Sequence, residues 1–409
     1  MITKKITFIH CADLHLDSPF KGLRNMTPAK YKDVQESTFI ALSRLVHLAI
    51  EQQVDFVLLV GDIFDKEILS LKAQIRFKEA MEQLEQHSIQ VFASFGNHDY
   101  VEQRSLAVSL PSNVHLFETE DVTFLPFIKN GERIAHIYGF SYEKREVQEN
   151  KVEEYVQRDG ARFHIATLHG SLSTNTEHDV YAPFQLSELV TTSFDYWALG
   201  HIHKREVLKA KPAIVYPGNI QGRSKKETGE KGCYLVELDE KNTDLSFYPL
   251  QEIRFETSEI DVHECSNLGE IAAKLKHSLQ HHVYGKCILT IRFKGYQSSL
   301  GEWHRSGEIT ELIDLENERE SFSKADWTHI EGYKTNYYQD PSQQTAEELG
   351  FRKEVFRSLH EEIDIQEILK PILQHRQVRK HLDIFTDGEV KELEEAAEEL
   401  LIDQLTKEG

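Results

Sequence analysis

The chain has 409 residues, which is too long for one ordinary domain and predicts two or three. Hydrophobic residues make up 40% of the sequence and charged residues 28%, so the composition suits a folded core and argues against a largely disordered chain. The 68 acidic residues outnumber the 47 basic ones, and the formal net charge of −21 excludes a protein that coats nucleic acid through a generally basic surface. An enzyme that acts on nucleic acid stays open, because bound metal ions and local basic loops can contact phosphate.

The cysteine pattern and the hydropathy indicate a cytoplasmic protein. No two of the four cysteines form a Cys-x-x-Cys pair; they are Cys11, Cys233, Cys265 and Cys287. This argues against a disulfide framework or a thiolate zinc site and is typical of a reducing compartment. The apolar run at the N-terminus is cut short at residues 11–13 and does not have the form of a signal peptide. No stretch approaches the roughly 20 apolar residues that span a bilayer.

Short apolar runs alternate with helical patterns through the first half of the chain. Five runs predict buried strands, at residues 5–10, 55–60, 89–95, 163–168 and 194–199. Apolar residues at helical spacing lie between the first two runs, over residues 39–50, and more loosely between the second and third, over residues 75–84. This alternation predicts an α/β layered domain, in which ligands bind beyond the carboxyl ends of the strands.

The second half of the chain predicts two further regions. A strand and turn at residues 212–219, a polar loop at 221–232 and a strand at 232–238 complete the first domain. The pattern then restarts with a strand at 257–262, a helix at 268–280 and a strand at 287–293, which predicts a small second α/β domain. From Asp340 onward the chain holds 18 acidic and 9 basic residues, a pattern typical of helices with an acidic exposed face. We expect domains at 1–250, 251–335 and 336–409.

A short polar motif follows each of the five predicted strands. In chain order the motifs are Asp13-Leu14-His15, Gly61-Asp62-Ile63-Phe64-Asp65, Gly96-Asn97-His98-Asp99, His169-Gly170 and Gly200-His201-Ile202-His203. Imidazole nitrogens with carboxylate and amide oxygens suit manganese, iron or zinc. A pair of such ions about 3.5–4 Å apart can clamp a phosphate and activate water, and one carboxylate can bridge them. In a strand, residues i and i+2 point to one face, so Asp13 with His15 and His201 with His203 can each deliver two side chains to one site.

Each motif alone has an ordinary structural explanation. Asp-x-His is usually a solvated turn, Gly-Asp-x-x-Asp can cap a helix, and Gly-Asn-His-Asp suits a plain turn. A single His-Gly carries no information, and Gly-His-Ile-His is stronger but ambiguous. All five in this order, each behind a predicted strand, are poorly explained by coincidence.

The ordered motifs resemble the calcineurin-like metallophosphoesterase superfamily. Longer stretches resemble its SbcD-type DNA exonuclease branch, and most of all the YhaO-type proteins: HCADLHLDSPF, LVGDIFD, GNHDY, LHG, ALGHIHKRE and YPGNIQGRSKKETGEKG. The resemblance covers roughly the first 330 residues. It implies a four-layered α/β/β/α sandwich over residues 1–250, a small α/β cap over 251–335 where family members contact DNA, and a helical C-terminus that can dock an ATPase partner.

The resemblance also implies a role for each motif residue. One metal ion would be held by Asp13, His15, Asp62 and His203. The second would be held by Asp62, Asn97, His169 and His201, with Asp62 bridging the two ions. His98 and Asp99 would be the catalytic pair: His98 would act on the scissile phosphate or protonate the leaving oxygen, and Asp99 would orient it. Asp17 and Asp65 would lie around the ligands.

A basic loop follows the last motif by one strand. It contains Arg223, Lys225, Lys226 and Lys231, of which the first three are candidates for binding substrate. Contact with the phosphates of the backbone and a solvated charge cluster are about equally good interpretations.

The expected function is metal-dependent hydrolysis of DNA phosphodiester bonds, exonuclease or endonuclease, in DNA repair. The expected cofactors are two divalent ions per chain, manganese first with iron or zinc as alternatives. The expected partners are DNA, an SbcC-like coiled-coil ATPase and a second copy of the chain, with no membrane. Two alternatives stay open: a phosphatase or a nucleotide or cyclic-nucleotide phosphodiesterase with the same metal site, and a non-catalytic metal-binding scaffold.

Overall fold

The computed structural model describes residues 5–20, 23, 26–65, 70–100, 107–174, 181–281, 285–294, 298–319 and 326–335, together with positions 354, 368, 393 and 397. The chain divides into two compact units, Met1–Asn336 and Tyr337–Gly409. The predicted helical region 336–409 lies outside the described residues except at the four single positions. The boundary predicted at residue 250 falls inside the first unit, and the division of that unit at this point stays a prediction.

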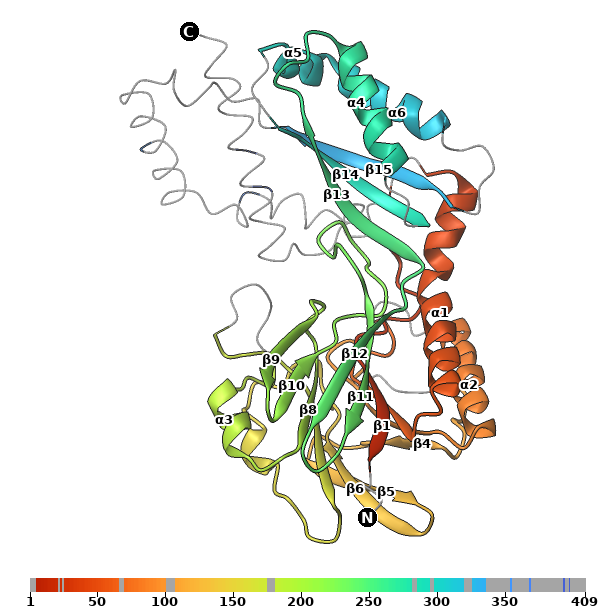
Figure 1. Cartoon of the computed structure of the whole chain (residues 1–409), viewed down its shortest axis with the longest axis vertical. Coiled ribbons are helices and arrows are strands. Elements are labelled where there is room, and N and C mark those ends of the chain that lie inside the picture. The colour runs from red at the N-terminus through yellow and green to blue at the C-terminus, as the bar shows by residue number, and fades with distance from the viewer. Residues whose placement is uncertain are drawn as a thin grey trace. The chain divides into compact units, whose positions relative to one another are not determined.

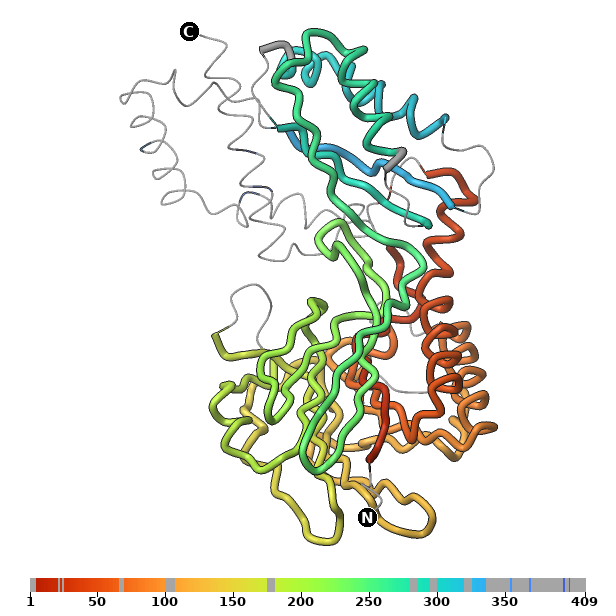
Figure 2. Tube along the Cα trace, in the orientation of Figure 1, coloured from red at the N-terminus to blue at the C-terminus, as the bar shows by residue number. Residues whose placement is uncertain are grey.

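Two large mixed sheets form the body of the first unit (Figure 1). The first sheet has the order β12-β11-β1-β2-β3-β4, with parallel pairing from β1 to β4 and antiparallel pairing of β11 with both neighbours. In chain order its strands are β1 (Ile6–Cys11), β2 (Phe56–Val60), β3 (Gln90–Ser94), β4 (Val114–Leu116), β11 (Gly232–Leu238) and β12 (Thr243–Pro249). The tube trace shows β1, at the red end of the colour scale, beside the much later green β11 (Figure 2).

The second sheet has the order β5-β6-β7-β8-β10-β9, with its central pairs from β6 to β10 parallel and its two outer pairs antiparallel. Its strands are β5 (Thr123–Lys129), β6 (Glu132–Gly139), β7 (Phe163–His169), β8 (Tyr196–Gly200), β9 (Glu206–Ala210) and β10 (Ala213–Tyr216). A short 3-10 helix, η2 (Val152–Glu154), precedes β7. All five strands predicted ahead of the motifs are present, with small shifts at their ends.

Three hydrophobic cores separate four layers. The helices α1 (Pro28–Glu51) and α2 (Leu71–Gln86) share one core with Val57 and Leu59 of β2. The alternate residues of β2, Phe56 and Leu58, share a second core with the inner face of the other sheet. The outer face of that second sheet forms the third core with α3 (Leu186–Thr191), around the fully buried Trp197. This α/β/β/α arrangement confirms the predicted fold class, and burial on both faces explains why β2 is apolar throughout.

A small three-stranded parallel sheet follows the two large ones. It consists of β13 (Ile253–Asp261), β14 (Lys286–Lys294) and β15 (Thr328–Thr335), in the order β13-β14-β15. The chain between these strands forms α4 (Leu268–His281), α5 (Ser298–Ser306) and α6 (Glu308–Arg319). The predicted strand at 257–262 therefore starts earlier, at Ile253, and the predicted helix and following strand are confirmed as α4 and β14. We call residues 253–335 the cap.

The first turns of α1 contact the cap through hydrogen bonds, an ion pair and apolar packing. The Asp33 carboxylate accepts a hydrogen bond from Trp327 Nε1 at 2.8 Å, and its Oδ2 lies 3.0 Å from Lys286 Nζ. Lys30 Nζ donates to the carbonyl of Thr328 at 3.3 Å. Because Trp327 packs in one core with Val34, apolar and ionic contacts together connect α1 to the cap.

The four cysteines are all buried and are present as thiols. Within the described part of the chain, no helix combines the length and the apolar character needed to cross a membrane.

Candidate metal centre

The five motifs meet where strands of the two sheets end. The ends of β1, β2 and β3 are adjacent in the first sheet, since Cys11 pairs with Leu59 and Val60 with Ser94. In the second sheet, His169 at the end of β7 pairs with Gly200 at the end of β8. Ligands in open α/β sheets bind at such carboxyl ends, and the ligand-type side chains predicted from sequence do converge there.

Asp13, His15, Asp62 and His201 lie in turns beyond the strands, whereas His169 is the last residue of β7. The strand periodicity expected for the pairs Asp13/His15 and His201/His203 is therefore wrong. β1 ends at Cys11, and Asp13 and His15 have φ values of 52° and 42°. Asp62 and His201 also have positive φ, at 50° and 93°. Left-handed backbone at non-glycine residues costs of order 1–3 kcal/mol each and is concentrated at functional sites. Here the strain is held by hydrogen bonds between the turns, from Asp13 N to Gly61 O at 3.2 Å and from His15 N to Asp62 O at 3.0 Å.

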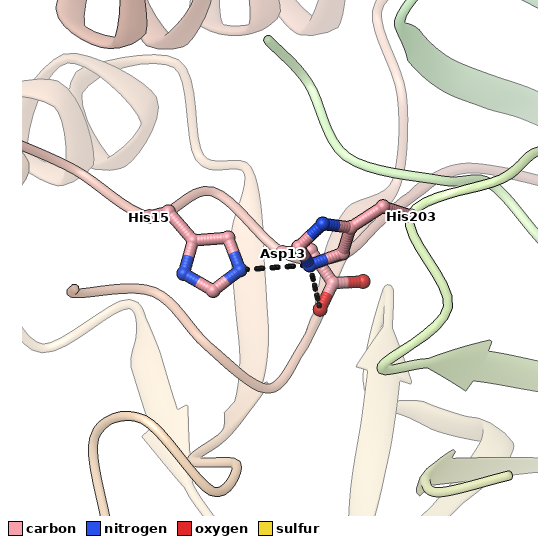
Figure 3. Close-up of side chains that lie close together, drawn as sticks. All are labelled: Asp13, His15 and His203. Carbon is pink, nitrogen blue, oxygen red and sulfur yellow. Dashed lines mark hydrogen bonds and ion pairs between the residues drawn. The ribbon is translucent and has the colours of Figure 1, made fainter. Parts of the chain in front are cut away.

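A first cluster consists of Asp13, His15 and His203 (Figure 3). His15 Nε2 and His203 Nε2 are 3.0 Å apart, and His203 Nε2 lies 3.8 Å from Asp13 Oδ1. Two nitrogens bound to one ion at about 2.1 Å would lie roughly 3.0–3.4 Å apart, so the ring spacing suits a shared cation. Asp13 is fixed in this position because both of its carboxylate oxygens accept from His201 N, at 3.1 and 3.2 Å.

A second cluster lies beside the first and consists of Asp62, Asn97, His169 and His201. His169 Nε2 lies 3.1 Å from Asn97 Oδ1 and 3.5 Å from Asp62 Oδ2. His201 Nδ1 lies 3.2 Å from the same Asn97 oxygen. His169 Nδ1 faces the carbonyl of Val60 at 3.0 Å, which leaves its Nε2 directed at the cluster. The donor set of two imidazoles, an amide oxygen and a carboxylate fits a divalent transition metal.

Asp62 lies between the two clusters. Its Oδ2 is 3.7 Å from His15 Nε2 and 3.5 Å from His169 Nε2, and its Oδ1 accepts from His98 N at 2.9 Å. One carboxylate oxygen therefore faces a histidine of each cluster, which is the geometry that a bridging ligand needs.

The electrostatics of this buried centre favour added positive charge. Burial raises the pKa of Asp13 to about 6 and lowers the pKa of His15. Burial also opposes the charged forms of Asp62 and His169, but their mutual attraction prevails: it holds the pKa of Asp62 low and raises that of His169 to about 9. A divalent cation would compensate the same carboxylates without a proton on the ring.

Glycines make room for the ligand side chains. An ideal Cβ on Gly61 would lie 2.1 Å from His169 Nδ1, and one on Gly200 would lie 2.1 Å from Val60 O. A Cβ on Gly96 would lie 2.4 Å from Asp62 Oδ1 and 2.6 Å from His169 Nε2. The turns at the strand ends are therefore shaped around these ligands.

Replacing Gly96 by Ala is expected to displace Asp62 and His169 together. Overpacking of this kind costs about 1–3 kcal/mol, which corresponds to a loss of roughly 5- to 150-fold in metal affinity. Calorimetric titration with Mn²⁺ measures this loss. The control is Gly332→Ala in β15, where an added Cβ meets no atom within 4 Å. Wild-type affinity for two ions in Gly96→Ala would contradict the assignment of these two ligands.

His98 lies at the centre, but Asp99 does not orient it. The Asp99 carboxylate instead accepts from three backbone amides: Ile63 N at 2.8 Å, Phe64 N at 3.2 Å and Gly96 N at 2.8 Å. The Asp99 carboxylate thus links the turn after β2 to the turn after β3 through hydrogen bonds. Burial raises the pKa of Asp99 to about 7. The direct orienting role expected for Asp99 is corrected to a structural one.

The His98 ring packs against that of His15 with a centroid distance of 4.8 Å. Its Nδ1 is buried and has no hydrogen-bond partner among the described residues. Burial lowers the pKa of His98, and the nearby Asp62 carboxylate opposes this effect. A ring with an unpartnered nitrogen beside the two clusters is available to a further group.

Arg223 is the basic-loop residue that reaches the centre. Its Nη1 donates to Asp65 Oδ2 at 2.6 Å, and its charge contributes to the lowered pKa of His15 and His98 after the larger effect of burial. Lys225 and Lys226 are exposed on the same loop. The predicted neighbour Asp65 is thus at the site, whereas Asp17 accepts from Ser70 Oγ at the start of α2.

Of two residues that contact His203, Glu227 is missing from the sequence-based prediction, and Lys231 appears there only as a member of the basic loop. Glu227 Oε1 lies 2.7 Å from His203 Nδ1, and Lys231 Nζ donates to the carbonyl of His203 at 2.8 Å. Neither has a ligand-type motif around it. The one available signal is the position of Glu227, which directly follows Lys225 and Lys226 in the basic loop.

Comparison with known proteins identifies the family of the chain. A family model described as calcineurin-like phosphoesterase matches residues 6–205. The uncharacterized metallophosphoesterase YhaO of Bacillus subtilis is 37% identical over 415 residues, covering 98% of each chain. The DNA double-strand break repair protein Mre11 of Methanocaldococcus jannaschii is 27% identical over 290 residues, covering 68% of this chain and 72% of that protein. Mre11 of Thermoplasma acidophilum is 25% identical over 262 residues, covering 60% and 66%. The chain therefore belongs to the calcineurin-like metallophosphoesterases.

Proposed function

We propose that the protein is a metal-dependent nuclease that hydrolyses DNA phosphodiester bonds with two divalent ions, manganese in preference to iron or zinc. The observation that carries this proposal is the placement of Asp62 Oδ2 between a histidine of each ligand cluster. Membership of the family supports phosphoester hydrolysis in general. The similarity to proteins named for DNA double-strand break repair supports DNA as the substrate and repair as the process.

The proposed ligands are those in which the predicted roles and the geometry agree. Bound divalent ions supply Lewis-acid activation of the phosphate and a water of lowered pKa. One ion would be held by Asp13, His15, Asp62 and His203, and the other by Asp62, Asn97, His169 and His201. The left-handed turns and the glycines around them hold these side chains in place before an ion arrives.

The proposed substrate contacts come from His98 and the basic loop. His98 lies next to both clusters, its Nδ1 has no hydrogen-bond partner in the part of the chain that the structure describes, and it would act on the leaving oxygen of the scissile phosphate. Arg223 would bind a phosphate oxygen near the ions, while the exposed Lys225 and Lys226 would contact phosphates farther along the strand. These cations offset part of the acidic charge of the chain, of which −9 lies beyond residue 339.

We also propose an SbcC-like coiled-coil ATPase as the partner of residues 336–409, a second copy of the chain as a further partner, and the cytoplasm as the compartment. The presence of all four cysteines as buried thiols supports a reducing environment.

The test is turnover by the full chain with Mn²⁺. Labelled single- and double-stranded DNA would be compared with p-nitrophenyl phosphate, bis-p-nitrophenyl phosphate and cyclic nucleotides. We expect DNA cleavage that EDTA abolishes and Mn²⁺ restores, and that persists in His47→Ala, a control at an exposed histidine of α1. Turnover of monoesters or cyclic nucleotides without DNA cleavage would replace the proposal by the phosphatase or phosphodiesterase alternative. Two bound ions without any turnover would favour the scaffold.

A further inference from the structure

The His203 ring is held by a hydrogen bond to a carboxylate on the side that faces away from the first cluster. Its Nε2 faces His15 and Asp13, while its Nδ1 lies 2.7 Å from Glu227 Oε1. A histidine that binds a metal through Nε2 must carry its proton on Nδ1, so the bond to Glu227 selects the tautomer that a ligand needs. A carboxylate in this position also makes the imidazole a stronger donor.

Glu227 is itself fixed by two further donors. Its Oε2 accepts from Asn219 Nδ2 at 2.7 Å and from Arg223 N at 2.7 Å. Its side chain is only 16% exposed. Each carboxylate oxygen therefore has a distinct function, one toward His203 and one toward the loop, and the residue has little freedom to turn away from the ring.

The outer nitrogens of His169 and His15 are held differently. His169 Nδ1 uses the neutral carbonyl of Val60, and His15 Nδ1 lies 3.9 Å from Asp65 Oδ2 with no hydrogen-bond partner among the described residues. In His203, by contrast, the ring nitrogen that faces away from the clusters is hydrogen-bonded to a carboxylate. Glu227 should therefore affect metal binding at the first cluster, to which His203 belongs.

We propose that Glu227 is a positioning residue that fixes the tautomer and orientation of His203 and thereby sets the affinity of the site formed by Asp13, His15, Asp62 and His203, leaving the other site intact. This inference rests on the proposed two-metal centre.

The loop that carries Glu227 also connects His203 to the cap. Gln221 Nε2 donates to the carbonyl of Ile253 at 2.7 Å, and its Oε1 accepts from Ile253 N at 3.1 Å. Gly229 N donates to the carbonyl of Phe255 at 3.0 Å. The position of Glu227 is therefore set in part by β13, the first strand of the cap, so the cap supports the metal ligand through this loop.

The test is metal binding by Glu227→Gln. Three donors point at the two carboxylate oxygens, from His203, Asn219 and Arg223, so a glutamine must turn its NH₂ toward at least one of them. By calorimetric titration with Mn²⁺ we expect one ion to bind as in the wild type and the other 10- to 100-fold more weakly. In electron paramagnetic resonance, the signal of the coupled Mn²⁺ pair should give way to that of isolated Mn²⁺ at sub-saturating metal. Glu230→Gln, an exposed acid in the same loop, is the matched control.

A second variant separates positioning from a structural role. His203→Ala should show the same loss of one ion, and the double variant with Glu227→Gln should show little further loss, because both act through one nitrogen. Two ions bound with wild-type affinity in Glu227→Gln would overturn the inference. Equally weakened binding of both ions, together with a lower melting temperature of the metal-free variant, would also overturn the inference. It would show that Glu227 stabilises the loop and does not act on His203 in particular.

The readout separates this inference from the proposed nuclease function. Selective loss of one ion in a protein that cleaves no DNA would leave the inference standing while the nuclease proposal fails. A wild-type chain that binds fewer than two ions would overturn both.

Discussion

Replacing Asp62 by Asn is expected to release both metal ions and to lower phosphodiester hydrolysis by at least about a thousandfold, equivalent to about 4 kcal/mol of barrier. The reason is that Asp62 Oδ2 faces His15 on one side and His169 on the other, so its charge serves both clusters. Asparagine keeps an oxygen that can accept from His98 N, so the turn itself should survive.

Metal analysis after removal and reloading of Mn²⁺ measures the first effect, and cleavage of labelled DNA measures the second. Asp121→Asn, at an exposed carboxylate, serves as the control. Two ions per chain and normal turnover in Asp62→Asn would show that Asp62 is not a shared ligand.

The second large effect is expected from His98→Ala. General acid catalysis is typically worth 10²–10⁴-fold, so DNA cleavage should fall by about that factor while both ions stay bound. The deficit should be much smaller for nitrophenolate esters, because this leaving group departs without a proton. Comparing the two substrates at saturating Mn²⁺, with metal content measured in parallel, tests both parts.

His98 also has a competing interpretation that the same experiment resolves. With His15 and Asp62 it forms a group whose ligand atoms could hold an ion. If His98 were a ligand, His98→Ala would lose metal and the deficit would be equal for good and poor leaving groups. His87→Ala, at an exposed histidine after α2, controls for the loss of an imidazole.

The central strands and the convergence of the motif side chains could be predicted because both leave short local signals. Each central strand is buried on two faces and appears in the sequence as an apolar run, and each candidate ligand follows such a run within a few residues. Strands at the edges of the sheets gave no such signal: β12 is mostly half-buried or exposed along its length, and β5 is similar. The positions of β12 and β5 depend on their pairing with β11 and β6, and this pairing leaves no periodic pattern in the local sequence.

The start of α1 was missed for a related reason. Its apolar periodicity begins near Phe39, but the helix begins at Pro28, with Thr27 as its N-cap. The intervening turns face the cap through Lys30, Asp33 and Val34. Their partners lie almost 300 residues later in the chain, so no local window contains the reason for this part of the helix.

The site shows the same division between local and long-range information. The type and order of the motif residues predict which side chains converge, but not that Asp13, His15 and Asp62 sit in left-handed turns. The sequence GNHD places Asp99 next to His98, yet the carboxylate turns to backbone amides across a neighbouring turn. Glu227 lies in a loop with no ligand motif and acquires its role only when that loop folds back onto His203.

The pairing of β1 with β11 affects how the chain folds during its synthesis. Ile6 pairs with Leu238 and His10 with Tyr234, so β1 waits for a neighbour encoded more than half the length of this chain later. Until then one edge of β1 has no hydrogen-bonding partner, and the side chains of Ile6 and Phe8, buried in the finished protein, lack the Val236 and Leu238 that pack in the same core. High separation between pairing strands slows folding and prolongs exposure to aggregation. The same topology means that a nascent chain that still lacks His203 and β11 cannot yet form the first cluster of Asp13, His15 and His203.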